Sequence, residues 1–258
     1  MTRTICAAFV GAIFLLTSAA QAAILVDLTT RGSSGTINGA LYQQFDAQPT
    51  GTGVLNTFLR VQKQGVEQGY NTDWRPTGLD EKVDLHTRSL LLSETPKVTI
   101  SDITYREFLL DINEAANEPL LSLNEVQIFL AATGNVHNRS NLGAPLYDMD
   151  AGTDANVKLN YSLNHGSGSG DMLLYVPDSL FNGNAEPYVY LYSRFGEPIP
   201  GDNSDVSNTS EAGFEEWAAG KKGPNGTIVP VTPPPVPEPG SIALLLICAT
   251  AMLRRRGR

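Results

Sequence analysis

Alternating apolar and polar side chains recur along the chain and predict short strands. The clearest stretch is residues 156–163, in which Val157, Leu159 and Tyr161 alternate with polar neighbours, the period of a half-buried strand. Residues 172–176 continue this alternation beyond a glycine-rich turn, and we predict that the two segments pair as a hairpin. Further strands are predicted at residues 23–28, 41–45, 54–62, 89–92, 98–103, 105–113, 120–130 and 188–192.

The segments between these strands are rich in Gly, Pro and Asn, and we read residues 29–39 and 65–78 as loops. No long amphipathic helix is apparent, although residues 211–219 are compatible with one or two helical turns. Many short strands separated by turn residues are typical of an all-β fold, and we expect a jelly-roll-like antiparallel β-sandwich over residues 23–219. Residues 220–235 turn to Gly, Pro and Thr, which predicts a semi-rigid linker.

The N-terminus has the pattern of an export signal. A basic start at Arg3 is followed by an apolar run from Ile5 to Leu16 and by the small-residue site Ala20-Gln21-Ala22. This order predicts a signal peptide over residues 1–22 that is removed in the mature protein.

The C-terminus combines two prolines flanking Glu238, an apolar run over residues 241–253 and a basic end. At about 1.5 Å per residue the run is roughly 20 Å long, short of the roughly 30 Å of bilayer hydrocarbon. Extension to residue 240 and snorkelling arginines make a short transmembrane helix over residues 240–253 feasible. The arginines are then expected on the cytoplasmic side.

Residues 236–258 resemble the PEP-CTERM sorting signal of Gram-negative bacteria. The resemblance implies recognition by exosortase, a membrane-embedded cysteine transpeptidase-like enzyme, followed by removal of the tail and export to the cell surface or extracellular matrix. A membrane anchor that is never cut is the alternative. The segment is also named as an ice-binding protein C-terminal domain, a label for the tag that gives no indication of ice binding. The residues of the signal, which are substrate groups for another enzyme, are Pro237, Glu238, Pro239, Arg254, Arg255 and Arg256.

The mature region is similar to a group of uncharacterised PEP-CTERM proteins, a group that carries no established activity. The resemblance extends over most of the mature chain, so it supports the class of protein and leaves its function open. The similar segments are residues 56–60, 67–72, 105–113, 166–172 and 214–217.

Removing both ends makes the protein more acidic and free of cysteine. The ends contain five of the 18 Lys and Arg residues and none of the 27 Asp and Glu residues, so residues 23–239 carry a net charge of −14. This charge disfavours nucleic acid and anionic lipid as partners. Cys6 and Cys248 both lie in the removed ends, so disulfides, thiolate metal sites and cysteine nucleophiles are excluded from the mature domain.

An acidic turn is a candidate calcium site. Asp148, Asp150 and Asp154 surround Gly152, and Ca²⁺ requires several oxygen ligands from a short loop. A solvated turn without metal is the alternative, and residues 201–205 form a weaker candidate of the same kind.

Tyr188, Tyr190 and Tyr192 alternate along one predicted strand and share a face. An exposed row of aromatic rings is a platform for sugar rings, and extracellular polysaccharide would be its partner. Cross-strand packing inside a sheet is the alternative.

Catalytic patterns are weak. The glycine run at residues 166–170 matches neither a nucleophile elbow nor a dinucleotide-binding loop, and His86, His137 and His165 lack zinc-site spacing. Carboxylate pairs such as Glu107 with Asp111, or Glu215 with Glu216, suit a glycosidase, but acidic residues are abundant in this chain.

We therefore expect no enzyme and no certain cofactor. The expected protein is an exported cell-surface or matrix protein, structural or adhesive and associated with exopolysaccharide or biofilm. Two alternatives stay open: a carbohydrate-binding module and a secreted polysaccharide hydrolase.

Overall fold

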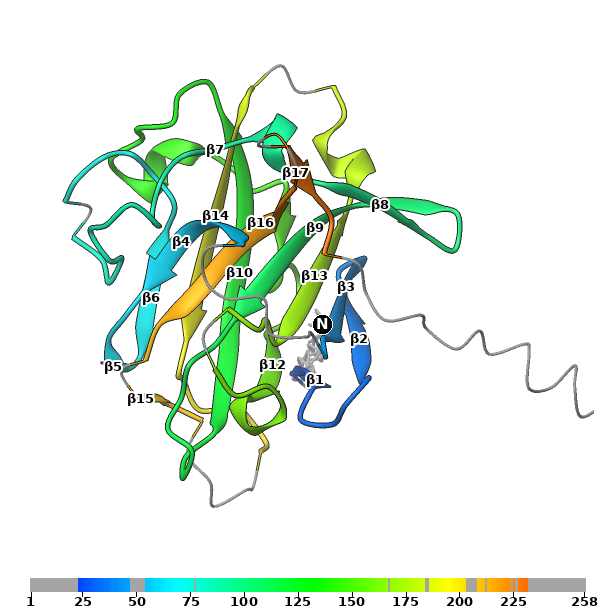
Figure 1. Ribbon diagram of the computed structural model, residues 1–258, viewed down its shortest axis with the longest axis vertical. Helices are drawn as coiled ribbons and strands as arrows, with labels where there is room; N and C mark the ends of the chain where they lie inside the picture. The colour runs from blue at the N-terminus through cyan, green and yellow to red at the C-terminus, as the bar shows by residue number, and fades with distance from the viewer. Residues whose placement is uncertain are drawn as a thin grey trace, which may run out of the picture.

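Strands dominate the computed structural model (Figure 1). It describes residues 23–231 except 47–53, 77, 167, 184–185, 203–207, 212, 224 and 226. The strands are β1 (Ile24–Asp27), β2 (Ser34–Ile37), β3 (Ala40–Gln44), β4 (Leu55–Val61), β5 (Gln64–Gly65), β6 (Glu67–Tyr70), β7 (Leu90–Leu91), β8 (Lys97–Ile100), β9 (Ile103–Asp111), β10 (Leu120–Ala131), β11 (Tyr147–Asp148), β12 (Ala155–Asn160), β13 (Met172–Pro177), β14 (Tyr188–Phe195), β15 (Ser210–Glu211), β16 (Glu215–Lys222) and β17 (Ile228–Val229). Short 3-10 helices are η1 (Leu92–Glu94), η2 (Arg139–Leu142), η3 (Tyr161–Leu163) and η4 (Asp178–Phe181).

Two sheets divide these strands. The first has the order β1-β12-β10-β14-β6, with β11 beside β10 and β7 beside β14; the second has the order β17-β16-β9-β13-β3-β2, with β4 beside β16 and β8 beside β9. All pairs are antiparallel except β1 with β12, which is parallel. A small third sheet pairs β5 with β15. The described part of the chain is therefore all-β, with antiparallel sheets predominating.

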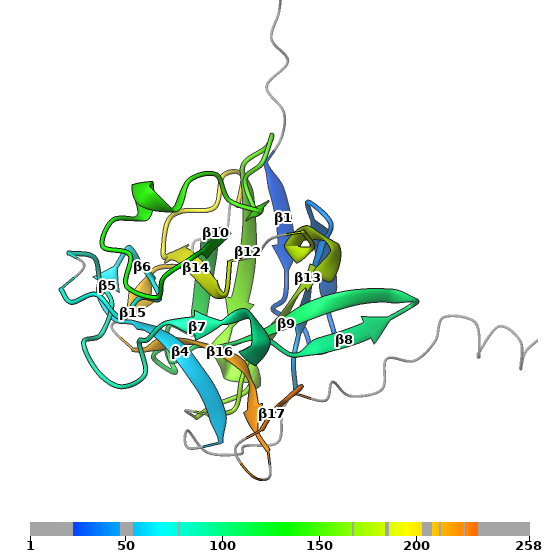
Figure 2. The same ribbon diagram turned by 90° about the horizontal axis from the view of Figure 1, so that it is seen from above.

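The main apolar core lies between the two sheets (Figure 2). Phe108 and Leu110 of β9 are fully buried in it, as their alternation predicts, and so is Leu191 of β14. Trp217 of β16 is also fully buried, and its indole Nε1 donates a hydrogen bond of 3.0 Å to Ser193 Oγ on β14. This bond satisfies the polar atom of a large buried ring and links the two sheets.

Two sequence predictions about strand and helix placement are wrong. Residues 156–163 and 172–176 do not pair with each other, because β12 lies in the first sheet and β13 in the second. Residues 211–219 are not helical: β16 pairs with both β4 and β9 there. Its alternate side chains pack into apolar clusters on opposite faces of the second sheet, so non-local pairing overrides local helix propensity.

The segments read as loops and linker also contain paired strands. β2 lies within residues 29–39 and β6 within residues 65–78. At the other end the sheet continues past residue 219, since β16 reaches Lys222 and pairs with β17. Val231 is buried against the outer face of the second sheet, and its amide donates to Glu107 Oε1. The folded domain thus extends at least to residue 231, and the predicted linker boundary at 220 is wrong.

The predicted signal peptide (1–22), the remainder of the linker (232–235), the sorting signal (236–258) and its transmembrane helix (240–253) lie outside the described residues. In the part of the chain that is described, no helix has the length and apolar character needed to cross a bilayer.

Candidate functional site

The three tyrosines of β14 share one face, as predicted, but they do not form an open row. Tyr190 and Tyr192 are each only 1% exposed, and both belong to an apolar cluster on the outer face of the first sheet. Residues 132–142 fold back over this face: the Tyr190 hydroxyl donates to Thr133 O (2.6 Å), and the Arg139 guanidinium lies 3.8 Å from the Tyr192 ring centroid. The exposed three-tyrosine platform is therefore wrong, because a loop distant in sequence covers two of its rings.

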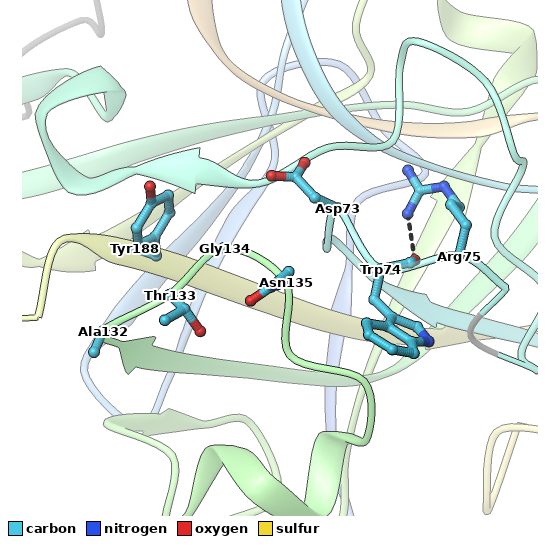
Figure 3. Close-up of a pocket in the computed structure, with 8 residues that line it drawn as sticks. All are labelled: Asp73, Trp74, Arg75, Ala132, Thr133, Gly134, Asn135 and Tyr188. Carbon is cyan, nitrogen blue, oxygen red and sulfur yellow. Dashed lines mark hydrogen bonds between the residues drawn. The ribbon is translucent and has the colours of Figure 1, made fainter.

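Tyr188 is the member of the row that stays partly open, and it borders a hollow of about 680 Å³. Figure 3 shows Tyr188 on one side of this hollow and the Trp74 indole on the other, with Asp73 and Asn135 between them. Trp74 is 42% exposed, a large fraction for tryptophan in a folded domain. The hollow is lined by Asp73, Trp74, Arg75, Ala132, Thr133, Gly134, Asn135 and Tyr188.

The stretch after β6 forms one wall of this Trp74 hollow. Beyond the end of the strand, hydrogen bonds from side chains hold this stretch in place. The Asn71 amide donates to Val189 O (2.9 Å) and accepts from Leu191 N (2.6 Å), which continues the ladder beside β14. Thr72 Oγ1 donates to Val136 O (2.9 Å). Arg75 Nη1 donates to Trp74 O (2.8 Å), and the guanidinium also bonds the backbone carbonyl of Thr87. Trp74 is thus presented on a braced loop.

The opposite wall, residues 132–140, is fastened to the first. Asp73 N donates to Gly134 O (2.9 Å), and the Asp73 carboxylate accepts from Ser89 N (2.8 Å). Gly134 permits this approach, because a Cβ atom there would lie 2.5 Å from the Ser89 Cβ. The Trp74 ring contacts the His137 ring with centroids 4.8 Å apart. Both walls are therefore set before any ligand arrives, which lowers the entropic cost of binding.

A second, smaller hollow of about 230 Å³ lies along the same covering loop. His137, Asn138 and Ser140 line it together with Gln68 of β6. Trp74 lines the larger hollow and His137 lines the smaller one, and the contact between their rings places the two hollows near each other.

The chemistry of the Trp74 hollow is that of a binding site. Two aromatic rings offer apolar faces, and Asp73, Thr133 and Asn135 add groups that hydrogen-bond hydroxyls. Asp73 is its single carboxylate among the eight lining residues, whereas glycosidases place two carboxylates across the bond that they cleave. The glycosidase pairs considered from the sequence lie elsewhere: Glu107 accepts from Val231 N, and Glu216 is ion-paired with Arg60.

The predicted calcium site is not formed, because two of its three carboxylates accept hydrogen bonds from backbone amides of the same turn. Asp148 Oδ1 accepts from Asp150 N (3.0 Å), Asp150 Oδ1 accepts from Ala155 N (2.9 Å), and Asp154 points to solvent as an exposed residue. Burial raises the pKa of Asp150 to about 6. Throughout the described ranges, no three Asp, Glu, His or Cys side chains are set to hold a metal ion. Asp202 of the weaker candidate pairs with Lys158 Nζ at 2.6 Å.

Trp74, within the segment predicted as a loop, and Asn135, to which no role is predicted, are site residues that the sequence analysis does not identify. A tryptophan within the polar stretch Asn71–Pro76 is a signal that could have drawn attention. Sequence reasoning also missed a buried group of glutamates, Glu67, Glu114 and Glu215, whose exposed fractions are 0%, 5% and 0%.

No protein-family model, curated protein or solved structure matches the chain. Its function is therefore argued from the geometry of these sites.

Proposed function

We propose that this domain is the sugar-binding part of an exported surface or matrix protein, with the Trp74 hollow as its site. The observation that carries the proposal is the exposed indole of Trp74, which faces the partly open Tyr188 across a hollow lined by Asp73 and Asn135. Sugar rings stack their apolar C–H faces on aromatic rings and offer hydroxyls to carboxylate and amide groups. Tyr190 and Tyr192 are buried and take no part in this site.

The ligand class that fits is an extended neutral polysaccharide. Two hollows, one lined by Trp74 and the other by His137, share the covering loop and meet at the contact between these rings. This arrangement suits consecutive sugar units of a chain better than one free sugar. The acidic composition of the domain, net −14 over residues 23–239, opposes polyanionic chains by charge repulsion.

The architecture and the ends of the chain complete the proposal. We infer a jelly-roll-like arrangement of the two sheets, and we retain the PEP-CTERM hypothesis for residues 236–258. In this view exosortase processes the tail, and the released or surface-held domain adheres to exopolysaccharide. Intact masses from hosts with and without exosortase test the tail, and the same full-length tail in both hosts would reject sorting.

The sugar site is tested on a glycan array that includes neutral polysaccharides and their oligomers, followed by calorimetry on the best ligand. Trp74→Ala is expected to weaken binding about 10- to 100-fold, the range for loss of a central aromatic anchor. Leu85→Ala is the matched control, because Leu85 is 92% exposed in the same long loop but does not line the hollow. Binding of no glycan, or equal affinities of the Trp74→Ala and Leu85→Ala variants, would overturn the proposal.

A further inference from the structure

Three buried glutamates meet at the end of the domain where β5 pairs with β15. Glu67 begins β6 in the first sheet, Glu215 begins β16 in the second, and Glu114 lies in the connection from β9 to β10. All three are buried, and Glu215 lies within hydrogen-bonding reach of both other carboxyl groups. The trio therefore joins both sheets and the connection between them. Figure 1 shows β5, β6, β15 and the start of β16 at this end of the domain.

The outer members of the trio hold backbone groups of their neighbours. Glu67 Oε2 accepts from Lys63 N (2.7 Å), just before β5, and Glu114 Oε2 accepts from Glu211 N (2.8 Å), on β15. Each thus has one oxygen bonded to an amide next to or within the small third sheet. Their remaining Oε1 atoms are buried and lie outside hydrogen-bond geometry with any donor among the described residues. The nearby Ser210 hydroxyl only partly offsets the effect of burial on the pKa of Glu67.

Glu215, the central member of the trio, accepts no hydrogen bond from a donor group among the described residues. Both carboxyl oxygens of Glu215 are buried without a hydrogen-bond donor in the described part of the chain. Carboxylates only accept hydrogen bonds, so three ionised groups here would face one another without a bond between them. A proton on Glu215, and one on a neighbour, turns these contacts into O–H···O bonds and satisfies the orphaned oxygens.

The surrounding charges do not neutralise the trio. The charged groups that act most strongly on it from outside are carboxylates: Asp80 lies near Glu67, Glu211 lies near Glu114, and Glu118 lies beside Glu211. The Lys63 amine is turned toward Asp80, 3.3 Å away, and is 55% exposed. Among the described residues, the three carboxyl groups are also not arranged around a common point as metal ligands would be. Protons are the remaining way to remove the mutual repulsion of three buried charges.

We propose that Glu67, Glu114 and Glu215 form a proton-held clasp that keeps the β5–β15 end of the domain closed in acid and releases it when the protons leave. Closure here depends on close packing: a Cβ atom on Gly196 would lie 2.1 Å from Gly65 O of β5. Three ionised carboxylates would push β6, β16 and the β9–β10 connection apart at this tight point. The clasp is independent of the sugar site, which lies along other loops.

The titration of the trio supports this device. Burial, followed by its carboxyl neighbours, raises the pKa of Glu215 far above its ordinary range, and burial raises the pKa of Glu114 to about 7. Burial also raises the pKa of Glu67. A raised carboxyl pKa means that the closed state binds protons that the opened state releases, so closure is complete in acid and weakens as the pH rises through about 7.

The test is amide hydrogen exchange from pH 5 to pH 9, corrected for intrinsic exchange, at the Lys63 and Glu211 amides that the trio holds. The native protein is expected to lose protection there about tenfold per pH unit for each proton released. The amide of Leu191, held by the uncharged Asn71 side chain, is the internal control, and its protection should fall less steeply with pH than that of the two reporter amides.

Two variants make the result specific. Glu215→Gln keeps the shape, donates through its amide and cannot ionise, so it should flatten the pH dependence at both reporter amides; Glu114→Gln should do so at Glu211 if the first variant fails to fold. Glu107→Gln removes a different buried carboxyl group and should leave the dependence intact. The clasp is refuted if the reporters keep their protection at pH 9 in the native protein, or if the Gln variants match it. It is equally refuted if calcium at pH 9 restores protection in the native protein but not in Glu215→Gln, because a cation would then be the binding agent.

Discussion

Replacing Tyr190 with Phe tests whether the Tyr190 hydroxyl, which lies beneath the covering loop, holds that loop in place as one wall of the proposed sugar site. The substitution keeps the buried ring, which is 1% exposed, and removes only the hydroxyl. That hydroxyl donates to Thr133 O (2.6 Å) and accepts from Val136 N (3.1 Å). Both partners belong to the loop that forms one wall of the Trp74 hollow, although Tyr190 itself does not line the hollow.

The magnitude follows from the two bonds. Each is worth about 0.5–1.5 kcal/mol net, so the loop should lose about 1–3 kcal/mol of anchoring. At about 1.4 kcal/mol per tenfold, the Val136 amide should exchange with solvent roughly 10- to 100-fold faster. Sugar binding should weaken in parallel, because Thr133 and Asn135 are then held less firmly.

Tyr192→Phe is the matched control for this prediction. It removes one bond, from the tyrosine hydroxyl to Gln68 Oε1 (2.6 Å) on β6, and leaves the Thr133 and Val136 contacts in place. Exchange is followed by NMR and global stability by urea unfolding. If the Val136 amide exchanges at the native rate in Tyr190→Phe, or if Tyr192→Phe accelerates it equally, the loop is not positioned by the Tyr190 hydroxyl.

Three further predictions concern stability and the hollow. Arg106→Ala removes the 2.6 Å partner of the mostly buried Asp178 carboxylate, which keeps Lys97 Nζ at 2.8 Å, and it frees Thr95 O, so urea unfolding should show a loss of about 1–3 kcal/mol; a loss below about 1 kcal/mol would contradict this. Native stability should fall as the pH rises from about 4 to 7, since burial raises the pKa of Glu107 to about 7 and of Asp111 to about 6. The folded state then binds protons that the unfolded state has lost, at about 1.4 kcal/mol per pH unit per proton. Because Glu114 and Glu215 titrate in the same direction, Glu107→Gln/Asp111→Asn should make the urea-midpoint profile shallower than that of the native protein, with Asp178→Asn as control; an unchanged slope in the double variant would contradict the assignment. Gly134→Ala should push the covering loop away from Ser89. The loss of sugar-binding free energy should then exceed the loss of folding free energy, and an unchanged affinity would show that the loop accommodates the methyl group without moving the site.

Strand location was the part of the fold most open to prediction from sequence. The alternation of Phe108, Leu110 and Ile112 correctly placed three residues in the core, because the side-chain period of a strand is local and set by the backbone. The face of β14 on which each side chain lies was equally predictable from sequence, since Tyr190 and Tyr192 do share a face. Whether that face is open was not readable, since the loop over it begins more than fifty residues earlier in the chain.

Strand partners and the sites were decided by tertiary structure. β12 and β13 are neighbours in sequence yet lie in different sheets, because the pairing of strands depends on the core that both sheets must bury. The Trp74 hollow joins the stretch after β6 to the stretch after β10, and no local pattern links these segments. Burial of Glu67, Glu114 and Glu215 likewise arises only where three distant segments meet.

The sequence by itself therefore determined an all-β chain with its strands in approximate place, and it supplied the resemblance that predicts export and sorting. Tertiary structure decided which aromatic ring is exposed, which acidic residues are buried and that the folded domain continues past residue 220. The physical reason is range: a strand's period is carried by successive residues, whereas exposure, charge neutralisation and the shape of a hollow depend on contacts between residues far apart in the chain.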